Sequence, residues 1–341
     1  MECPPYFMPP SMRHWLCLPD VFGSHISLAK GGVMHLHQEN DTVAGLPPGG
    51  LSGILGVDQP TGRTVGSAQG GTVALGETTG TMEEEYLYDW NVIGEGEIAR
   101  PAAVEVNDET LRDGLQSPSV RQPDLSEKVE ILHRMEALGI HAADIGYPGA
   151  GPGMLDHVVA LAKEIAAEDL EIKPNCAGRT HVSDILPISE AQQRSGVAIE
   201  AAVFLGSSPI RQFVEGWDAD FLVRTTEKAV TFARNEGLEV MYVTEDTTRA
   251  RADVLRRVYT AAIEAGARRI CLADTVGHAT PWGVRVLVSF VRQIVADSGE
   301  EVKIDWHGHR DRNLSVFNSL VALSAGADRV HACGLGLGER V

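Results

Sequence analysis

His307 and His309 stand one residue apart in the stretch DWHGHRDRN, directly after a short apolar segment. Residues i and i+2 of a strand point to the same side, so the two imidazoles would project together, and Gly308 leaves room between them. Paired imidazoles next to a carboxylate form a corner that binds a divalent metal ion. The spacing therefore predicts two metal ligands; two polar residues in a turn are the alternative.

Polar residues also follow other predicted strands, most densely in the stretch NDETLRDGLQSP. A solvated turn would explain any one of them. The polar residues that follow six of the eight predicted strands are, in chain order, Asp108, Glu109, Arg112, Asp113 and Gln116; Asp144; Ser207 and Ser208; Glu245 and Asp246; Asp274 and Thr275; His307 and His309. Their recurrence indicates one shared site.

The elements that would position these residues begin near residue 103, where short β-branched segments alternate with amphipathic ones. The predicted strands lie at 102–106, 141–146, 171–177, 197–204, 238–243, 268–273, 302–306 and 328–333. The apolar spacing of a helix is clearest in Leu125, Val129, Leu132, Met135 and Leu138. Asp124 or Ser126 can begin this helix, and Gly139 can end it.

Eight predicted strands and seven complete helices alternate strictly, which is typical of parallel βα units. Eight is the number of strands that closes a (β/α)8 TIM barrel. An open doubly wound sheet is the competing architecture, but no G-x-G-x-x-G follows the first strand. We therefore expect a barrel at residues 101–341, with its chemistry at the C-terminal ends of the strands.

Residues 1–100 differ from the rest, because they hold 16 of the 36 glycines and show no sustained period. We expect them to form a poorly ordered or loosely packed, irregular extension. His35 and His37 repeat the H-x-H spacing there, but no third ligand stands nearby, so they predict no site.

Composition limits the classes of partner. The formal charge of -18 argues against nucleic acid or an anionic membrane as the principal partner. The five cysteines are scattered without a C-x-x-C pair, which suits a reducing compartment. No signal peptide or run of eighteen apolar residues can be recognised. We expect a soluble, cytoplasmic protein with small-molecule substrates.

Two other histidines and two cysteines near the predicted strand ends need a separate interpretation. His331 could face the barrel interior beside the site residues or be a hydrogen-bonded core histidine, and the strand pattern favours the second. His278 lies in a loop and could line the site or the surface equally well. Cys271 and Cys333 lie within strands and are expected to be small core residues rather than nucleophiles.

The segment DETLRDGLQ resembles the D-x-T-L-R-D-G-x-Q signature of a family of metal-dependent acyltransferases and lyases. That family includes 2-isopropylmalate, homocitrate and citramalate synthases and hydroxymethylglutaryl-CoA lyase. The resemblance covers residues 104–341 and continues through YPGAGPG, SSPIR, TEDTTR, ADTVGHATP and HGHRDRNLSVFNSL. It implies a TIM barrel that uses a divalent ion, Mg²⁺, Mn²⁺ or Zn²⁺, with acetyl-CoA as co-substrate.

The resemblance also implies roles for single residues. The implied metal ligands are Asp113, His307 and His309; the implied catalytic residues are Arg112, which would steady the keto or enolate oxygen, and Glu245; the implied substrate-binding residues are Gln116, Asp144, Ser207 and Thr275. Asp144 stands where relatives commonly have Glu.

The last residues bear on the branch of the family. GLGLGER resembles the G-x-G-E-R-x-G-N segment of the synthases, whereas hydroxymethylglutaryl-CoA lyases have G-G-C-P with a catalytic cysteine. Leu115 stands where the synthases usually have Glu, and in this respect the sequence resembles the lyases. Arg310 stands where the common H-x-H-N-D motif has Asn. The family's metal-binding Asn would lie two residues beyond Val341. We expect a barrel that is incomplete before its last helix.

The resemblance therefore implies a Claisen-type condensation of acetyl-CoA with an α-keto acid, as in leucine-type amino-acid biosynthesis. One alternative is a lyase or aldolase that cleaves a carbon-carbon bond on the same metal. The other is an inactive barrel fragment that acts as a binding module. We expect the full-length protein to be a homodimer.

Overall fold

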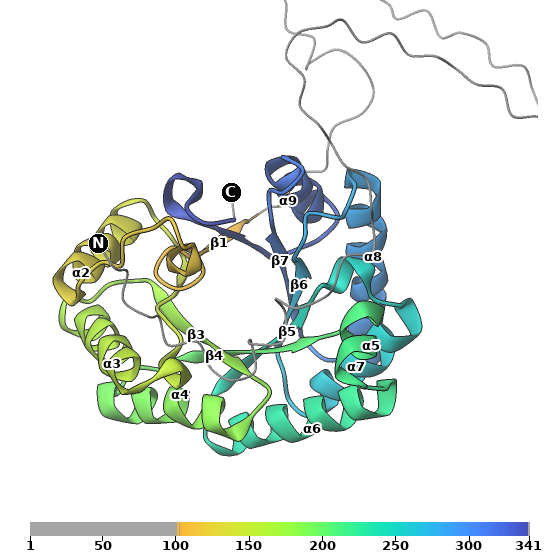
Figure 1. The fold of residues 1–341 in the computed structure, drawn as a ribbon, viewed down its shortest axis with the longest axis horizontal. Coiled ribbons are helices and arrows are strands. Elements are labelled where there is room, and N and C mark those ends of the chain that lie inside the picture. The colour runs from red at the N-terminus through yellow and green to blue at the C-terminus, as the bar shows by residue number, and fades with distance from the viewer. Residues whose placement is uncertain (1–100, 102, 340–341) are drawn as a thin grey trace, which may run out of the picture. The chain divides into compact units, whose positions relative to one another are not determined.

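The computed structural model describes residue 101 and residues 103–339, and Figure 1 shows their arrangement. The predicted extension, residues 1–100, lies outside the described residues, as do His35 and His37. Among the described residues, no helix combines the length and the apolar character that crossing a bilayer requires.

Eight parallel strands form a closed barrel in sequence order, which confirms the predicted TIM-barrel fold. The strands are β1 (Glu105–Asp108), β2 (Ala142–Asp144), β3 (Lys173–Arg179), β4 (Glu200–Gly206), β5 (Glu239–Glu245), β6 (Arg269–Asp274), β7 (Lys303–Gly308) and β8 (Arg329–Ala332). The first strand pairs with the last, so that Asn107 lies opposite His331. Each predicted strand overlaps the observed one.

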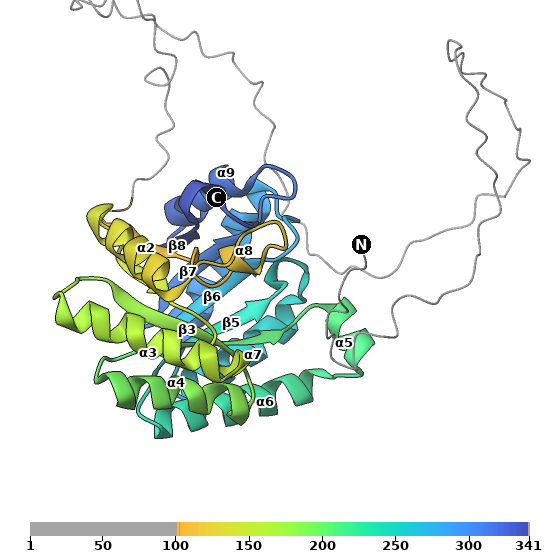
Figure 2. The same cartoon turned by 60° about the vertical axis from the view of Figure 1, so that its left-hand side comes forward.

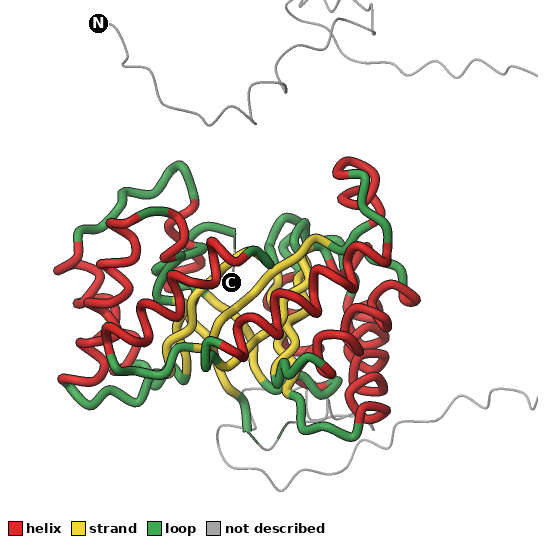
Figure 3. Tube along the Cα trace, turned by 90° about the horizontal axis from the view of Figure 1, so that it is seen from below, coloured by secondary structure: helices red, strands yellow, loops and turns green. Residues whose placement is uncertain are grey.

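The helices surround the strands in Figure 1, and Figure 3, turned by 90°, shows helices on both sides of the strands and in front of them. They are α2 (Leu125–Ala137), α3 (Pro152–Ala167), α4 (Val182–Ser195), α5 (Pro209–Glu215), α6 (Ala219–Asn235), α7 (Ala252–Glu264), α8 (Pro281–Ser298) and α9 (Ser315–Ser324). The short helix α5 buries none of its residues, and in Figure 2 it lies apart from the row of α3, α4 and α6.

Helix α2 shows how local sequence sets an element's ends. The side chain of Asp124 accepts a hydrogen bond from the amide of Glu127, and Glu127 accepts one from the amide of Asp124, so Asp124 rather than Ser126 is the cap. Gly139 follows the helix with φ of 72°, a left-handed conformation that favours glycine. Leu138, which continues the apolar spacing, is 78% exposed because the helix has already ended.

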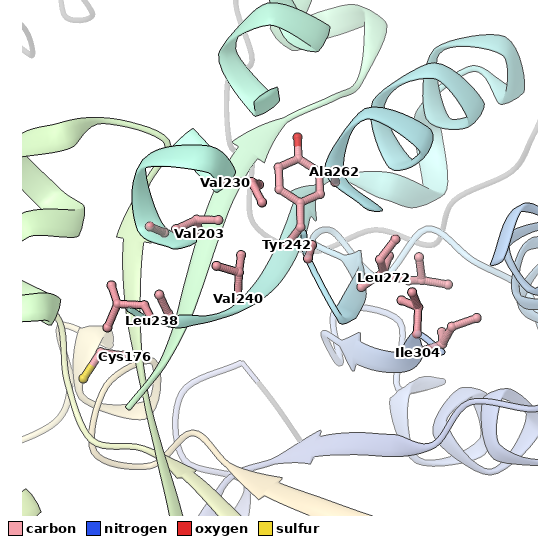
Figure 4. Close-up of a cluster of buried hydrophobic side chains, with 14 of the residues drawn as sticks. Cys176, Val203, Val230, Leu238, Val240, Tyr242, Ala262, Leu272 and Ile304 are labelled. Atoms are coloured by element: carbon pink, nitrogen blue, oxygen red, sulfur yellow. The ribbon is translucent and has the colours of Figure 1, made fainter. Parts of the chain in front are cut away.

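The main core lies between the barrel and the helices. Figure 4 shows part of it, including Val203, Val240 and Tyr242 from strands and Val230 and Ala262 from helices. Full burial of one such aliphatic or aromatic side chain stabilises the fold by about 1.5–3 kcal/mol. A second, small cluster lies separately and contains Ala202, Met241 and Cys271. Its members also line the cavity described below, so they face the interior of the barrel.

The N-terminal ends of the strands are joined by buried ion pairs. Arg329 contacts Asp305 at 2.6 Å and Glu200 at 2.8 Å, and Arg269 contacts Asp305 at 2.6 Å and Glu200 and Glu105 at 3.2 Å. Burial alone would raise the pKa of Asp305, but the two guanidinium groups hold it well below its ordinary value. Charges from β1, β4, β6, β7 and β8 thus neutralise one another at this end.

Candidate active site

A cavity of ≈ 270 Å³ collects most of the sequence-predicted site residues. Its polar lining residues are Glu109, Arg112, Asp113, Gln116, Asp144, Glu245, Thr275, His307, His309, His331 and Glu339; its remaining lining residues are Tyr147, Ala177, Ala202, Phe204, Met241, Val243, Cys271 and Ala273. Since parallel strands end at the same rim, residues distant in sequence meet there. Polar and apolar side chains therefore line one cavity that opens to solvent.

The predicted metal ligands come together. One ligand atom from each of Asp113, His307 and His309 lies within 4.8 Å of the others. Nε2 of His307 is 3.4 Å from Oδ2 of Asp113, and the two imidazole centroids are 5.5 Å apart. The rings stand close together because His307 lies in β7 and His309 follows directly after its last residue, Gly308. Nδ1 of His309 also lies 2.9 Å from a carboxylate oxygen of Glu339.

The protonation state of His309 is compatible with cation binding. Burial, together with the nearby ring of His307, lowers the pKa of His309 to about 3, so its ring is neutral at physiological pH. Neutral imidazole nitrogens and an ionised carboxylate are the forms in which these groups bind metal. The donor set of one oxygen and two nitrogens suits a divalent ion.

A second group of possible ligands, Glu109, His307 and His331, shares one histidine with the first. Its carboxylate already pairs with Arg112. Burial alone would raise the pKa of Glu109, but Arg112 and the hydrogen bonds from His307 and His331 hold it well below the ordinary value. Arg112 also contacts Asp113, but the carboxylate of Glu109 is in addition held by His331 at 2.8 Å and by the side-chain amide of Asn107 at 2.9 Å, so the group that contains Asp113 is the better cation site.

Arg112 lies among the polar lining residues of the cavity. Its guanidinium contacts Glu109, Oδ2 of Asp144 at 2.7 Å and Oδ1 of Asp113 at 3.0 Å. Burial by itself would lower the pKa of Arg112, but Glu109 and Asp144 raise it. These three contacts use three of the five N–H groups of a guanidinium, which leaves two for another acceptor.

Asp144 is almost fully buried beside Arg112. Burial raises its pKa to about 7, and the charge of Glu109 adds to this effect, although Arg112 opposes it. A carboxyl group with a pKa near neutrality can either give or take a proton at physiological pH. The amide of Gly146 also donates to Oδ1 at 3.2 Å, which fixes the carboxyl plane.

Gln116, Glu245 and Thr275 line the cavity, whereas Ser207 does not. The amide of Asp246 donates to Oγ1 of Thr275 at 2.8 Å, so the hydroxyl proton of Thr275 stays available for another acceptor. Ser207 is buried, and both its amide and its hydroxyl donate to the carbonyl of Glu245 at 3.1 Å. Its observed role is to hold the end of β5.

Glu109, His331 and Glu339 line the cavity, although the sequence pattern assigns none of them a specific role there. His331 is indeed a buried, hydrogen-bonded histidine, but it also borders the cavity. The alternation of a strand predicts which face of the sheet a side chain lies on, but it does not predict which residues that side chain contacts. His278 is exposed and lies outside the cavity lining.

The two cysteines have the predicted core character, and burial raises the pKa of both thiols, Cys271 and Cys333, well above the ordinary value. Thiols of this kind stay protonated at neutral pH and are poor nucleophiles.

Residues 103–341 match the HMGL-like family model. The chain is 34% identical over 247 residues to a 2-isopropylmalate synthase of Acidimicrobium ferrooxidans, covering 72% of this chain and 46% of that protein. It is 33% identical over 238 residues to one of Brevibacillus brevis, covering 70% and 45%. The chain therefore spans about half the length of the curated relatives it matches.

Solved structures share the barrel. An HMG-CoA lyase of Bacillus subtilis aligns with a TM-score of 0.56 at 19% identity, covering 70% of this chain and 80% of that one. An HMG-CoA lyase of Acinetobacter baumannii, in complex with coenzyme A and 3-methylmalate, aligns with a TM-score of 0.56 at 20% identity, covering 70% and 77%. At these identities the likeness concerns the fold.

Proposed function

The chain belongs to the HMGL-like family, and from this premise we propose that it condenses acetyl-CoA with an α-keto acid on a divalent metal ion. The reaction would be of the 2-isopropylmalate synthase type, as the names of the relatives suggest. One observation carries the proposal: the carboxylate of Asp113 and the imidazoles of His307 and His309 converge in the same cavity as Arg112.

Asp113, His307 and His309 would hold the metal ion, since their donor atoms are close enough to share one cation. Mg²⁺, Mn²⁺ and Zn²⁺ all accept a carboxylate with imidazoles, so the donor set leaves the choice among them open. When bound, the ion would supply Lewis-acid polarisation of the keto group.

Arg112 would stabilise the oxygen that becomes negative when the keto carbon is attacked. Two N–H groups of its guanidinium remain after the contacts with Glu109, Asp113 and Asp144. Those three carboxyl groups also prevent the guanidinium from turning. A donor that is already oriented costs no reorganisation when charge develops, and this is the main source of such stabilisation.

Thr275 and Gln116 would bind the carboxylate of the α-keto acid. The hydroxyl proton of Thr275 is available because Oγ1 already accepts the amide of Asp246. The apolar part of the cavity would receive the remainder of the keto acid. The rings of Tyr147 and Phe204 stand edge to face there, 6.4 Å between centroids, and form a wall suited to an aliphatic group.

A base must remove a methyl proton from acetyl-CoA before the new carbon-carbon bond forms. Glu245 lines the cavity, and its backbone carbonyl is held by Ser207, which fixes the start of its side chain. We assign the base to Glu245. Asp144, whose pKa is raised to about 7, would return a proton to the oxygen held by its partner Arg112. Hydrolysis of the thioester then completes the reaction.

The test is thiol release in the presence of metal. The purified chain would be incubated with acetyl-CoA, Mn²⁺ and, in turn, 2-oxoisovalerate, 2-oxoglutarate or pyruvate, with a colorimetric reagent for free thiol. We expect CoA release that depends on one keto acid and disappears in His309→Ala. A parallel assay with hydroxymethylglutaryl-CoA follows the formation of acetoacetate. If the chain cleaves hydroxymethylglutaryl-CoA but releases no thiol from acetyl-CoA, the proposed condensation is wrong and the lyase reaction takes its place. If neither assay shows a reaction, a binding module is favoured.

A further inference from the structure

His331 lies inside the barrel on β8, with 1% of its side chain exposed, and contacts three polar groups. Its Nε2 is 3.0 Å from Oδ2 of Asp305, and its Nδ1 is 2.8 Å from Oε1 of Glu109. Nδ1 is also 3.0 Å from Nδ1 of His307. The ring therefore bridges a residue of β7 and the loop after β1 while it touches a proposed metal ligand.

Both carboxylates that hold the His331 ring are themselves fixed. Asp305 accepts hydrogen bonds from Arg329 and Arg269, each at 2.6 Å, at the N-terminal end of the barrel. Glu109 accepts one from the side-chain amide of Asn107 at 2.9 Å and pairs with Arg112. A rotation of the His331 ring would break contacts at both of its nitrogens, so the ring has one stable orientation.

The orientation of His331 constrains His307. The ring of His307 points Nδ1 at His331 and Nε2 at Asp113, and the two imidazoles meet edge to face at 82° with centroids 5.1 Å apart. A metal-binding histidine commonly uses one nitrogen for the metal and the other for a hydrogen bond that orients the ring. In His307, Nε2 faces Asp113, while Nδ1 lies 3.7 Å from Oε1 of Glu109, which can accept its proton. The edge-to-face ring of His331 fixes the position of His307 beside that carboxylate.

Resting on the metal site proposed above, we infer that His331 is a positioning residue, fixed by Asp305 and Glu109, that orients His307 so that Nε2 faces the cation. His331 is not itself a ligand, because Nδ1 and Nε2 each already face a carboxylate oxygen. Asp305 acts on the site through His331, since its other ion pairs within the described part of the chain are with Arg269 and Arg329.

The test measures Mn²⁺ binding by the metal-free protein, with free Mn²⁺ followed by electron paramagnetic resonance. Wild type, His331→Gln, Asp305→Asn and the double variant would be compared with His309→Ala. Tyr242→Phe is the matched control, because it removes a buried hydroxyl bonded to Thr226 on the outer side of the barrel. Thermal unfolding of each metal-free variant reports the effect on stability separately.

We expect one Mn²⁺ per wild-type chain and an affinity lower by roughly 10- to 100-fold in His331→Gln and in Asp305→Asn. The double variant should bind Mn²⁺ about as tightly as the single variant with the lower affinity, because both changes break the same chain of contacts from Asp305 through His331 to His307. Tyr242→Phe should keep wild-type affinity even if it unfolds at a lower temperature. Should His331→Gln fail to fold, Glu109→Gln keeps the side-chain shape and should show a similar loss.

Three results would overturn the inference. His331→Gln with wild-type affinity would remove its positioning role. Two Mn²⁺ per wild-type chain and one in His331→Gln would make His331 a ligand. Additive losses in the double variant would separate Asp305 from His331. By contrast, a wild-type chain that binds no Mn²⁺, or a His309→Ala variant that binds it normally, would refute the proposed metal site itself.

Discussion

Arginines and carboxylates cluster at both ends of the barrel, but the two ends differ in how many hydrogen-bond donors remain for a ligand. At the N-terminal end, Arg329 is 3% exposed and is shared between Asp305 and Glu200. At the C-terminal end, Arg112 contacts three carboxyl groups yet borders a cavity and keeps two N–H groups. The same residue types stabilise one end and leave the other able to bind a ligand.

The comparison predicts the largest functional loss at the C-terminal end. His307→Ala should remove one ligand of the proposed cation and the ring that His331 orients. Mn²⁺ affinity should fall by more than the roughly 100-fold typical of outer-shell residues, and turnover should disappear. Thermal unfolding of the metal-free variant should stay close to that of wild type. Retained metal affinity would show that His307 is not a ligand.

The largest loss of stability is expected at the N-terminal end. Arg329→Met would leave Asp305 and Glu200 buried with fewer cationic partners, so the free energy of unfolding should fall by about 3–5 kcal/mol. Urea unfolding measures this change. Arg251→Met is the control, because its ion pair with Asp253 is about 70% exposed on both sides and should change stability by less than about 1 kcal/mol.

A smaller, purely catalytic effect is expected for Arg112→Lys. An ammonium group stays charged but cannot keep the guanidinium's contacts and also donate to the reacting oxygen. Turnover should fall by roughly 10²- to 10³-fold, while urea unfolding changes less than in Arg329→Met. The matched change Arg312→Lys, in an exposed arginine that bonds the carbonyl of His278, should leave turnover unaltered. Turnover of Arg112→Lys equal to wild type would exclude the oxyanion role.

The smallest effect concerns acid stability near the rim. Burial alone would raise the pKa of Asp184, but hydrogen bonds from Arg179 and Tyr147 lower it to about 2. A lowered carboxyl pKa stabilises the fold above the unfolded value of about 3.9, and this stability is lost as the pH falls toward 2. Asp184→Asn should therefore flatten the loss of stability between pH 4 and pH 2. At pH 7 it should cost only about 1 kcal/mol, because Arg179 is 64% exposed.

Much of the fold is readable from sequence because each βα unit repeats the same two periods. All eight strands fall where β-branched segments predict them, and the cap of α2 follows from Asp124 and Glu127. Helix α5 is not predicted as a separate element. Its apolar residues Ile210 and Phe213 are exposed, so the segment lacks the buried face on which a helical pattern depends.

The sequence predicts which residues lie at the strand ends, but it does not predict which of them contact one another. The H-x-H spacing correctly places His307 and His309 close together, and barrel closure correctly brings Asp113 to them. The partners of His331 could not be read, because they depend on the register that sets Asn107 of β1 opposite His331 of β8. Spacing also places Ser207 at the rim, but only three-dimensional packing shows that it turns to the carbonyl of Glu245.

The closing pair of strands has a consequence for how the protein is made. The amide of Gly334 donates to Oγ1 of Thr110 across 224 residues of chain, where the last strand meets the first. Ribosomes add about 5–20 residues per second, so this segment takes on the order of ten seconds or more to emerge. Throughout that time a nascent chain carries Asp113 without its imidazole partners. Binding of the proposed cation would therefore come late in biogenesis, after the barrel has closed.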